Sequence, residues 1–292
     1  MVIRAFRGGR SAAVAVAAGA ALVGLAAPAQ ATGQPLPYVA LGDSYSAASG
    51  VLPLDPSASL LCARSTKNYP HVVAERTGAT LKDVTCGGAQ TKDFVGAQYP
   101  GVAPQLDALG ADTRLVTMTI GGNDNSTFIN TILACATAGV LTAGQGSPCK
   151  DQNGTRFSDD IDTKTYPAVK AALQAVRNKA PDARVAILGY PWIMPAKAQS
   201  GCFAKMPIAS GDVPYVRDIQ THLNTAVRRA AAETGATYVD VAQASEGHDA
   251  CQPIGTRWVE PALFGTNFVP VHPNALGESA LAGLTMGALG LG

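Results

Sequence analysis

Charged side chains are scarce in this 292-residue sequence, at 15% of all residues, and aromatic side chains make up only 6%. The 22 basic and 21 acidic side chains nearly balance. Nucleic-acid-binding domains carry a clear excess of basic residues, so we expect no nucleic-acid partner. The sequence also contains no internal repeat and no linker rich in proline, serine or charge, which favours one large domain.

Metal-binding spacings are missing as well. The six cysteines include no CxxC pair, and the four histidines are scattered without an HxxxH pair, so we expect no metal and no other cofactor. Beyond the N-terminus there is no apolar run of the roughly 20 residues that a membrane-spanning helix needs. We therefore expect no stable membrane anchor, and nothing in the sequence indicates an oligomer, so we expect a monomer.

The N-terminus has the layout of a secretory signal peptide. Three arginines precede the alanine-rich apolar stretch 12–27, and Ala29-Gln30-Ala31 is a small-x-small cleavage pattern. We predict a signal peptide over 1–31, a single domain over 32–292 and a secreted, extracellular protein. Removing the three arginines leaves 19 basic and 21 acidic side chains, a net charge of −2.

All cysteines lie in the predicted exported part, and their number is even. This pattern predicts three disulfides, although the residues alone leave the pairing open. The cysteines are Cys62, Cys86, Cys135, Cys149, Cys202 and Cys251.

Short, mostly continuous apolar runs bounded by Gly, Asp or Pro predict strands that are covered on both faces. Helical periods with one apolar stripe alternate with them. The alternation predicts a three-layer α/β/α sandwich around a parallel sheet of about five strands. We interpret residues 138–160 as a long surface insertion. Strands are predicted at 38–41, 80–85, 114–120, 184–188 and 237–241, and helices at 166–176, 219–230 and 274–289.

Ligands bind at the carboxyl ends of the strands in such a sheet, so the residues that follow each strand are informative. Singly, they are ordinary helix caps and turn residues. Together, Ser44, Gly88, Asn123 and His272 supply what acyl transfer needs, namely a hydroxyl nucleophile, a base, and N–H donors for an oxyanion. The segments are Gly42-Asp43-Ser44-Tyr45-Ser46, Cys86-Gly87-Gly88-Ala89, Gly121-Gly122-Asn123-Asp124 and Val271-His272-Pro273-Asn274.

These four blocks, in this order, resemble the SGNH (GDSL) hydrolases, and in particular the secreted lipases and esterases of actinomycetes. The resemblance implies a flavodoxin-like fold with Ser44 as nucleophile and His272 as base. It also implies oxyanion donors at Ser44, Gly88 and Asn123. The GxSxG motif of the α/β-hydrolases is absent. The disulfides that the resemblance implies pair neighbours in sequence, as Cys62 with Cys86, Cys135 with Cys149, and Cys202 with Cys251.

One position departs from the family pattern. The family usually has an aspartate three residues before the histidine, where this chain has Val269. We expect a backbone carbonyl, from Val269 or Pro270, to accept the Nδ1 proton of His272 and form a Ser–His dyad. The rival hypothesis is a remote acid, Asp240 or Glu260.

The sequence therefore predicts a secreted serine ester hydrolase that acts on fatty esters such as acylglycerols. A phospholipase A or a polysaccharide deacetylase could use the same site, and a non-catalytic surface-binding protein is a further alternative. Asp124 could orient Asn123 or cap the next helix, and His248 could line the cleft. Five aromatic residues could form an apolar acyl pocket or pack the loops: Trp192, Phe203, Trp258, Phe264 and Phe268.

Overall fold

The structure is a computed structural model that describes Val2 and residues 35–292, so the predicted signal peptide lies almost entirely outside the described residues. Residues 35–292 are built on a sheet of five parallel strands in the order β2-β1-β3-β4-β5. The predicted α/β fold with a parallel five-stranded sheet is confirmed. The strands are β1 Pro37–Ala40, β2 Thr80–Asp83, β3 Leu115–Met118, β4 Arg184–Leu188 and β5 Thr237–Val239.

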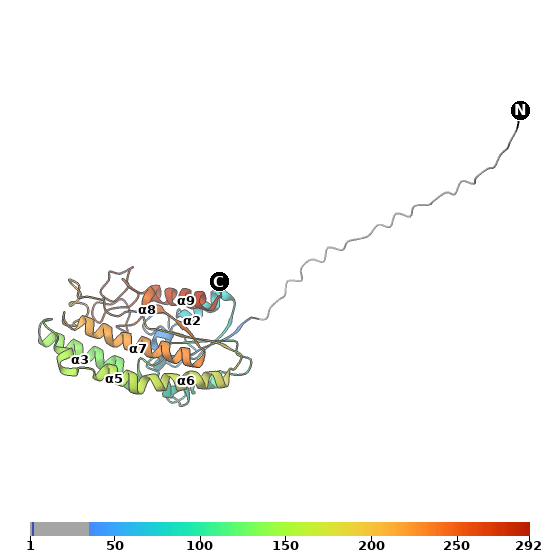
Figure 1. Cartoon of the computed structure of the whole chain (residues 1–292), viewed down its shortest axis with the longest axis horizontal. Coiled ribbons are helices and arrows are strands. Elements are labelled where there is room, and N and C mark those ends of the chain that lie inside the picture. The colour runs from blue at the N-terminus through green and yellow to red at the C-terminus, as the bar shows by residue number, and fades with distance from the viewer. Residues whose placement is uncertain (1, 3–34) are drawn as a thin grey trace. The chain divides into compact units, whose positions relative to one another are not determined.

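Helices cover both faces of the sheet because successive strand residues point to opposite sides. In β1, Tyr38 and Ala40 pack in the apolar cluster that includes residues of α2 and α9, whereas Val39 packs in the cluster of α6 and α7. Figure 1 shows α9 and α2 on one side and α6 and α7 on the other. The helices are α1 Ser44–Ala47, α2 Tyr69–Thr77, α3 Thr127–Leu141, α4 Pro148–Asn153, α5 Arg156–Asp160, α6 Tyr166–Lys179, α7 Val213–Thr234, α8 Val241–Ala244 and α9 Ala275–Leu289.

The strand order places the central crevice between β1 and β3. On one side of this crevice, β1 is followed by β2 at the edge of the sheet. On the other side, β3 is followed by β4 and then by β5. The loops that follow β1 and β3 therefore diverge and leave an opening at the carboxyl edge of the sheet. The segment with Ser44 follows β1 and the segment with Asn123 follows β3, so the fold brings these two residues to the same crevice.

The region that we interpret as a surface insertion, residues 138–160, lies mostly at the surface and is largely helical. Helix α3 continues to Leu141, and α4 and α5 follow it before a π-helical turn, Ile161–Thr165, leads into α6. No charged residue occurs between Asp124 and Lys150, so this region lacks the polar contrast that reveals an amphipathic helix. The structure stabilises it instead by burying Cys135 and Cys149, which are bonded to each other.

Three disulfides hold the loops at the carboxyl end of the sheet. Cys62–Cys86 joins the loop after α1 to the segment after β2, Cys135–Cys149 joins α3 to α4, and Cys202–Cys251 joins the loop before α7 to the loop after α8. Each such crosslink typically stabilises a fold by about 2–4 kcal/mol. Within the described residues, no helix is long and apolar enough to span a bilayer.

Candidate active site

Gly42, Asp43 and Ser44 form a sharp turn between β1 and α1. Gly42 has a φ of +123°, and a Cβ at this position would lie 2.5 Å from the carbonyl oxygen of Thr119, so only glycine fits. The Asp43 carboxylate accepts a hydrogen bond from the N–H of Tyr45 at 3.0 Å and caps α1. The turn presents Ser44 as the first residue of a short helix at the end of a central strand.

The hydroxyl of Ser44 faces the imidazole of His272. Ser44 Oγ lies 2.7 Å from His272 Nε2, and His272 Nδ1 lies 2.7 Å from the carbonyl oxygen of Pro270. A carbonyl oxygen only accepts hydrogen bonds, so Nδ1 carries the proton and Nε2 is the acceptor that faces Ser44. This tautomer is the one that a general base for the serine hydroxyl requires.

The backbone around Val271 sets the direction of the imidazole. Val271 has a φ of +58°, a conformation that is rare for a β-branched residue and costs on the order of 1–3 kcal/mol. The hydroxyl of Tyr45 donates to the Val271 carbonyl at 2.8 Å, and the rings of Tyr45 and His272 lie 5.1 Å apart. Tyr45, the residue after Ser44, thus holds the turn that points Pro270 O at Nδ1.

Neither acid of the rival hypothesis contacts the imidazole. Asp240 accepts from Arg228 at 2.6 Å and caps α8. Glu260 is buried, lies 2.6 Å from Arg257 and accepts from Asn274 at 2.8 Å. Burial acts to raise the pKa of Glu260, but its hydrogen bonds, with that from Arg257 the largest, lower it overall. Glu260 is therefore ionised and braces the loop that leads to α9.

Hydrogen-bond donors from three segments lie near Ser44. The side-chain amide of Asn123 donates to the carbonyl of Ala89 at 3.1 Å, which fixes the amide and leaves its second N–H free. Within the described residues, the backbone N–H groups of Ser44 and Gly88 have no hydrogen-bond acceptor. Gly88 has a φ of +76°, which favours glycine, whereas the space around it would admit a Cβ.

The other residues that the sequence singled out have structural partners. The carboxylate of Asp124 accepts from the N–H and the hydroxyl of Thr91, at 2.9 and 2.7 Å, so it joins the loops after β2 and β3. His248 stacks on Trp258 with ring centroids 4.4 Å apart, and its Nδ1 lies 2.6 Å from the carbonyl of Thr256. These contacts place Asp124 and His248 in the supporting structure.

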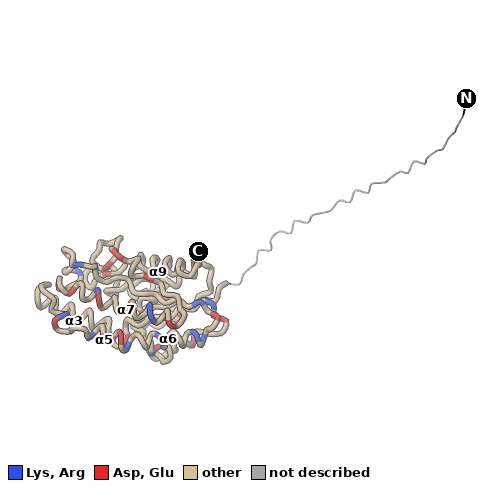
Figure 2. The backbone as a smooth tube through the Cα atoms, viewed as in Figure 1, with Lys and Arg blue, Asp and Glu red and all other residues tan. Residues whose placement is uncertain are grey.

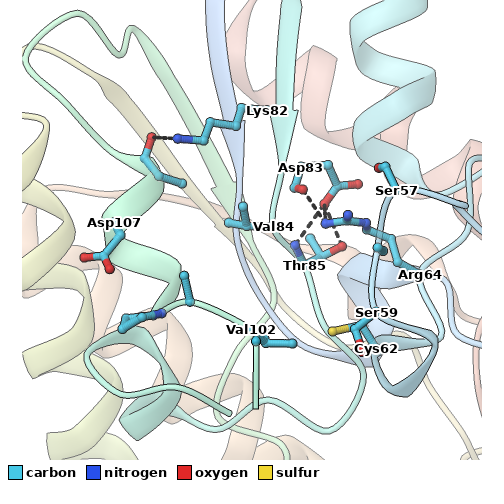
Figure 3. A pocket seen from close by; sticks show the side chains of 15 residues that line it. Ser57, Ser59, Cys62, Arg64, Lys82, Asp83, Val84, Thr85, Val102 and Asp107 are labelled. Carbon is cyan, nitrogen blue, oxygen red and sulfur yellow. Dashed lines mark hydrogen bonds and ion pairs between the residues drawn. The ribbon is translucent and has the colours of Figure 1, made fainter. Parts of the chain in front are cut away.

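A cavity of about 250 Å³ adjoins the end of β2 (Figure 3). Arg64 points into it, donates to the carbonyl of Asp83 and lies 3.7 Å from the Asp83 carboxylate. The same carboxylate accepts from the N–H and hydroxyl of Thr85, at 2.9 and 2.7 Å. Ser44 and His272 do not line this cavity. The contacts that Asp83 makes with Arg64 and Thr85 stabilise the segment that follows β2.

A second, apolar pocket is linked to the Ser44–His272 pair through Phe128. Phe128 lines it at the start of α3, and the Phe128 ring lies 6.4 Å from the His272 ring and 6.2 Å from the Tyr45 ring. None of the five aromatic residues singled out in the sequence lines this pocket. Its walls come from Ile132, Ile161, Ile193, Val216, Ile219 and Leu223.

Comparison with known proteins agrees with this geometry. The sequence profile of the GDSL-like Lipase/Acylhydrolase family matches residues 40–280. The chain belongs to this family. It is also 70% identical to Lipase 2 of Streptomyces coelicolor over 266 residues, which are 91% of this chain and 90% of that relative. The GDSL resemblance seen in the sequence is therefore confirmed, and the chain is a carboxylic ester hydrolase of the GDSL type.

Two solved structures extend the comparison. Phospholipase A1 from Streptomyces albidoflavus NA297 has a TM-score of 0.73 and 27% identity, and the match covers 87% of this chain and 100% of that one. The extracellular lipase from Streptomyces rimosus has a TM-score of 0.72 and 29% identity, with 87% and 99% covered. The GDSL fold is thus shared over nearly the whole described chain.

The GDSL site contains a buried hydrogen-bond chain that the sequence did not predict. The hydroxyl of Tyr190 donates to the Asp43 carboxylate at 2.5 Å and accepts from the N–H of Gly122 at 2.9 Å. Thr119 donates to the same carboxylate at 2.7 Å. Burial raises the pKa of Asp43 to about 6, although these hydrogen bonds lower it. Tyr190 thereby connects the turn of Ser44 to the loop that carries Asn123.

The surroundings of His272 predict the pH dependence of the GDSL enzyme. Burial lowers the pKa of His272 from 6.5, although the hydrogen bond to Pro270 acts to raise it. Because a general base works in its neutral form, we expect kcat/KM to rise with pH through an apparent pKa below 6.5 and then to remain level. NMR titration of the imidazole, assigned by difference from His272→Gln, separates this step from that of Asp43. An imidazole pKa well above 7 would indicate a carboxylate partner instead.

Proposed function

We propose that this GDSL hydrolase is a secreted lipase or esterase in which Ser44 is the nucleophile and His272 the general base. The observation that carries the proposal is the 2.7 Å contact between Ser44 Oγ and His272 Nε2, with Nδ1 directed at the Pro270 carbonyl. A nucleophile within hydrogen-bond reach of a base that is itself oriented by a third group is the arrangement that activates serine.

The reaction proceeds in two halves. Nε2 removes the hydroxyl proton while Ser44 Oγ attacks the ester carbonyl carbon, and the carbonyl oxygen becomes an oxyanion. The N–H groups of Ser44, Gly88 and Asn123 stabilise that oxyanion. The protonated imidazole then gives its proton to the leaving alkoxide, and the alcohol departs from the acyl-enzyme. A water molecule repeats the attack with His272 as base, and the acid is released.

The dyad has a physical consequence for the imidazolium. The Pro270 carbonyl carries no formal charge, so it orients the ring but stabilises the imidazolium less than a carboxylate would. Burial lowers the pKa of His272 and so favours the neutral form of the resting base. The hydrogen bonds made by Glu260 support the loop of His272 without placing a negative charge on the ring.

The apolar pocket supports a fatty acyl group as the part of the substrate that binds next to Ser44. Its walls offer aliphatic side chains, and each methylene buried there contributes about 0.8 kcal/mol. The names of the relatives point the same way, since Lipase 2 and the extracellular lipase act on lipid esters. The short acetyl group of a polysaccharide ester has only one methyl group to bury against such walls.

A covalent probe and a set of substrates test this proposal. We expect a fluorophosphonate to label Ser44 and to leave Ser44→Ala unlabelled. A series of nitrophenyl esters of rising chain length, with phosphatidylcholine and acetylated xylan beside them, then sorts the substrate classes. Absence of labelling would refute the serine mechanism. Preference for phosphatidylcholine would assign a phospholipase A, and preference for xylan a polysaccharide deacetylase.

Val216→Ala is expected to shift the preferred ester to a longer acyl chain. The substitution removes two methyl groups from the pocket wall, and one methylene in a pocket changes discrimination by about 10-fold or more. The measurement is kcat/KM across the nitrophenyl esters. Val227→Ala is the matched control, because Val227 is buried on the same helix but does not line the pocket. An equal shift in both variants, or in neither, would contradict the assignment of the pocket.

We further propose that residues 1–31 are a signal peptide and that the mature enzyme begins at Thr32. The three disulfides support an oxidising compartment. N-terminal sequencing of protein recovered from culture medium is expected to start at Thr32. Retention of the protein inside the cell with residues 1–31 intact would contradict export.

A further inference from the structure

Large apolar side chains are exposed in three segments around the site. Phe264 is 81% exposed, Leu52 67% and Leu61 61%, and Phe268, Leu133 and Ile129 are also exposed. We call these six residues the apolar rim. In the described part of the chain, helices α6 and α7 expose no large apolar side chain, whereas Leu60 and Leu263 extend two of the rim segments. Within residues 35–292, other exposed large apolar side chains are Val95, Val140, Leu141, Phe203, Ile254 and Leu276. Exposed apolar residues that cluster in this way mark interaction surfaces.

Two segments of the apolar rim meet beside His272. Phe268 lies four residues before the histidine, in the segment that also carries Phe264. Leu52 lies two residues after Gly50. A Cβ at Gly50 would lie 3.1 Å from Val269 Cβ, so the segment of Leu52 is in close contact with the segment of Phe268. This side of the rim is therefore continuous with the base.

The remaining apolar rim residues border the nucleophile from other directions. Ile129 follows Phe128, whose ring lies 6.4 Å from the His272 ring, and Leu133 lies one helical turn farther along α3. Leu61 precedes Cys62, whose carbonyl accepts from the N–H of Gly87 at 2.7 Å. The rim thus reaches the loop of Gly88.

The apolar rim lies in parts of the chain that carry almost no charge. Residues 125–149 and 261–277 contain no Lys, Arg, Asp or Glu, and the tube of α3 is uniformly tan in Figure 2, whereas α5 and α6 carry blue and red. In the segment of Leu52 and Leu61, the one charged residue is Asp55, which is paired with Arg64 at 3.0 Å. The rim matches a surface that is apolar and electrically neutral.

We propose that the apolar rim docks the enzyme on the surface of an aggregated, uncharged or zwitterionic lipid and so places the site over the lipid esters. This inference rests on the proposed function, because it assumes that the substrate is a lipid ester. Phe264 has a φ of +61°, an unfavourable conformation for a phenylalanine, and the resulting turn leaves its ring in solvent. Insertion of such a ring among acyl chains removes its apolar surface from water.

The test compares the full mature protein with the double variants Phe264→Ala/Phe268→Ala and Phe264→Leu/Phe268→Leu. Binding is measured by co-sedimentation with phosphatidylcholine vesicles. We expect the alanine variant to bind about 10-fold more weakly for each ring removed, and the leucine variant, which keeps apolar bulk, to bind within about threefold of the parent protein. Both variants are expected to hydrolyse soluble nitrophenyl acetate at the parental rate.

Several outcomes would overturn the docking proposal without touching the catalytic one. The parent protein could hydrolyse nitrophenyl acetate yet fail to bind vesicles, or the alanine variant could bind as well as the parent. Binding that requires anionic phosphatidylglycerol and is lost at high salt would assign docking to basic residues. The parent protein and the leucine variant could instead form dimers in sedimentation analysis while the alanine variant stays monomeric and no protein binds vesicles. That result would assign the rim to self-association. Failure of Ser44 labelling would instead refute the proposed function.

Discussion

Replacing His272 by alanine is expected to lower kcat on a nitrophenyl ester by about 10⁵- to 10⁶-fold, with KM little changed. Without the imidazole, Ser44 has no base, and its hydroxyl keeps the proton throughout the attack. The contact of 2.7 Å between Oγ and Nε2 makes His272 the base that lies within reach. Single-turnover kinetics under saturating ester measure the loss directly.

The acids of the rival hypothesis are the controls. Asp240→Asn is expected to keep kcat within about threefold, because Asp240 bonds Arg228 and caps α8, away from the imidazole. Glu260→Gln leaves the buried Arg257 without its charge partner and is expected to destabilise the fold by about 3–5 kcal/mol. Its kcat, measured well below the melting temperature, should fall by less than about tenfold.

A loss of about 10³-fold or more in Asp240→Asn would require a triad, because removing the orienting acid of a serine-protease triad costs about 10⁴-fold. The same loss in Glu260→Gln would count only if the melting curve shows that the variant is folded at the assay temperature. Agreement between the acid variants and the low imidazole pKa predicted above would establish the dyad by two independent measurements.

The sequence predicted the sheet well because each strand is an apolar run buried on both faces. Predicted strand 184–188 matches β4 residue for residue, and predicted strand 114–120 contains the whole of β3. Parallel strands end at one edge, so the strand-end rule also selected Ser44 and Asn123 as neighbours, whereas His272 comes from the segment before α9. The contact between Ser44 and His272 then depends on the turn at Val271, which no sequence pattern revealed.

The residues that hold the backbone of the site in place were harder to predict from the sequence than the site residues themselves. Tyr190 lies two residues after the end of β4, so the strand-end rule could have selected it, but a tyrosine there has no motif around it. Gln105 gave no signal at all, although its side chain brackets the backbone of Gly42 with hydrogen bonds of 2.7 and 3.0 Å. Such contacts arise between segments far apart in sequence, and only the folded backbone shows them.

The choice between Val269 and Pro270 as the acceptor for His272 illustrates the same limit. Both carbonyls precede the histidine closely, and the sequence left the choice open. A left-handed Val271, held by the hydroxyl of Tyr45, brings the Pro270 oxygen to 2.7 Å from Nδ1. Backbone conformation at one residue thus decides which atom replaces the missing aspartate.

Asn123→Ala is expected to lower kcat by about 100- to 1000-fold while KM stays nearly constant. The amide of Asn123 donates one N–H to Ala89 O and keeps the other for an oxyanion. A carbonyl in the ground state needs this donor much less than the tetrahedral intermediate does, so the loss falls on kcat. The measurement is a kcat and KM pair on nitrophenyl esters, together with the rate of fluorophosphonate labelling at Ser44.

Gln98→Ala is the control that distinguishes loss of the Asn123 donor from loosening of the loop that carries Gly88. Gln98 donates to the carbonyl of Gly87 at 2.7 Å and so holds the segment of Gly88. We expect its kcat to fall by less than about tenfold, since one supporting hydrogen bond is worth roughly 1 kcal/mol. If Gln98→Ala lost as much as Asn123→Ala, or if Asn123→Ala raised KM and spared kcat, Asn123 would act by holding the loop or the substrate. A selective loss of kcat in Asn123→Ala alone makes its free N–H a donor to the transition state.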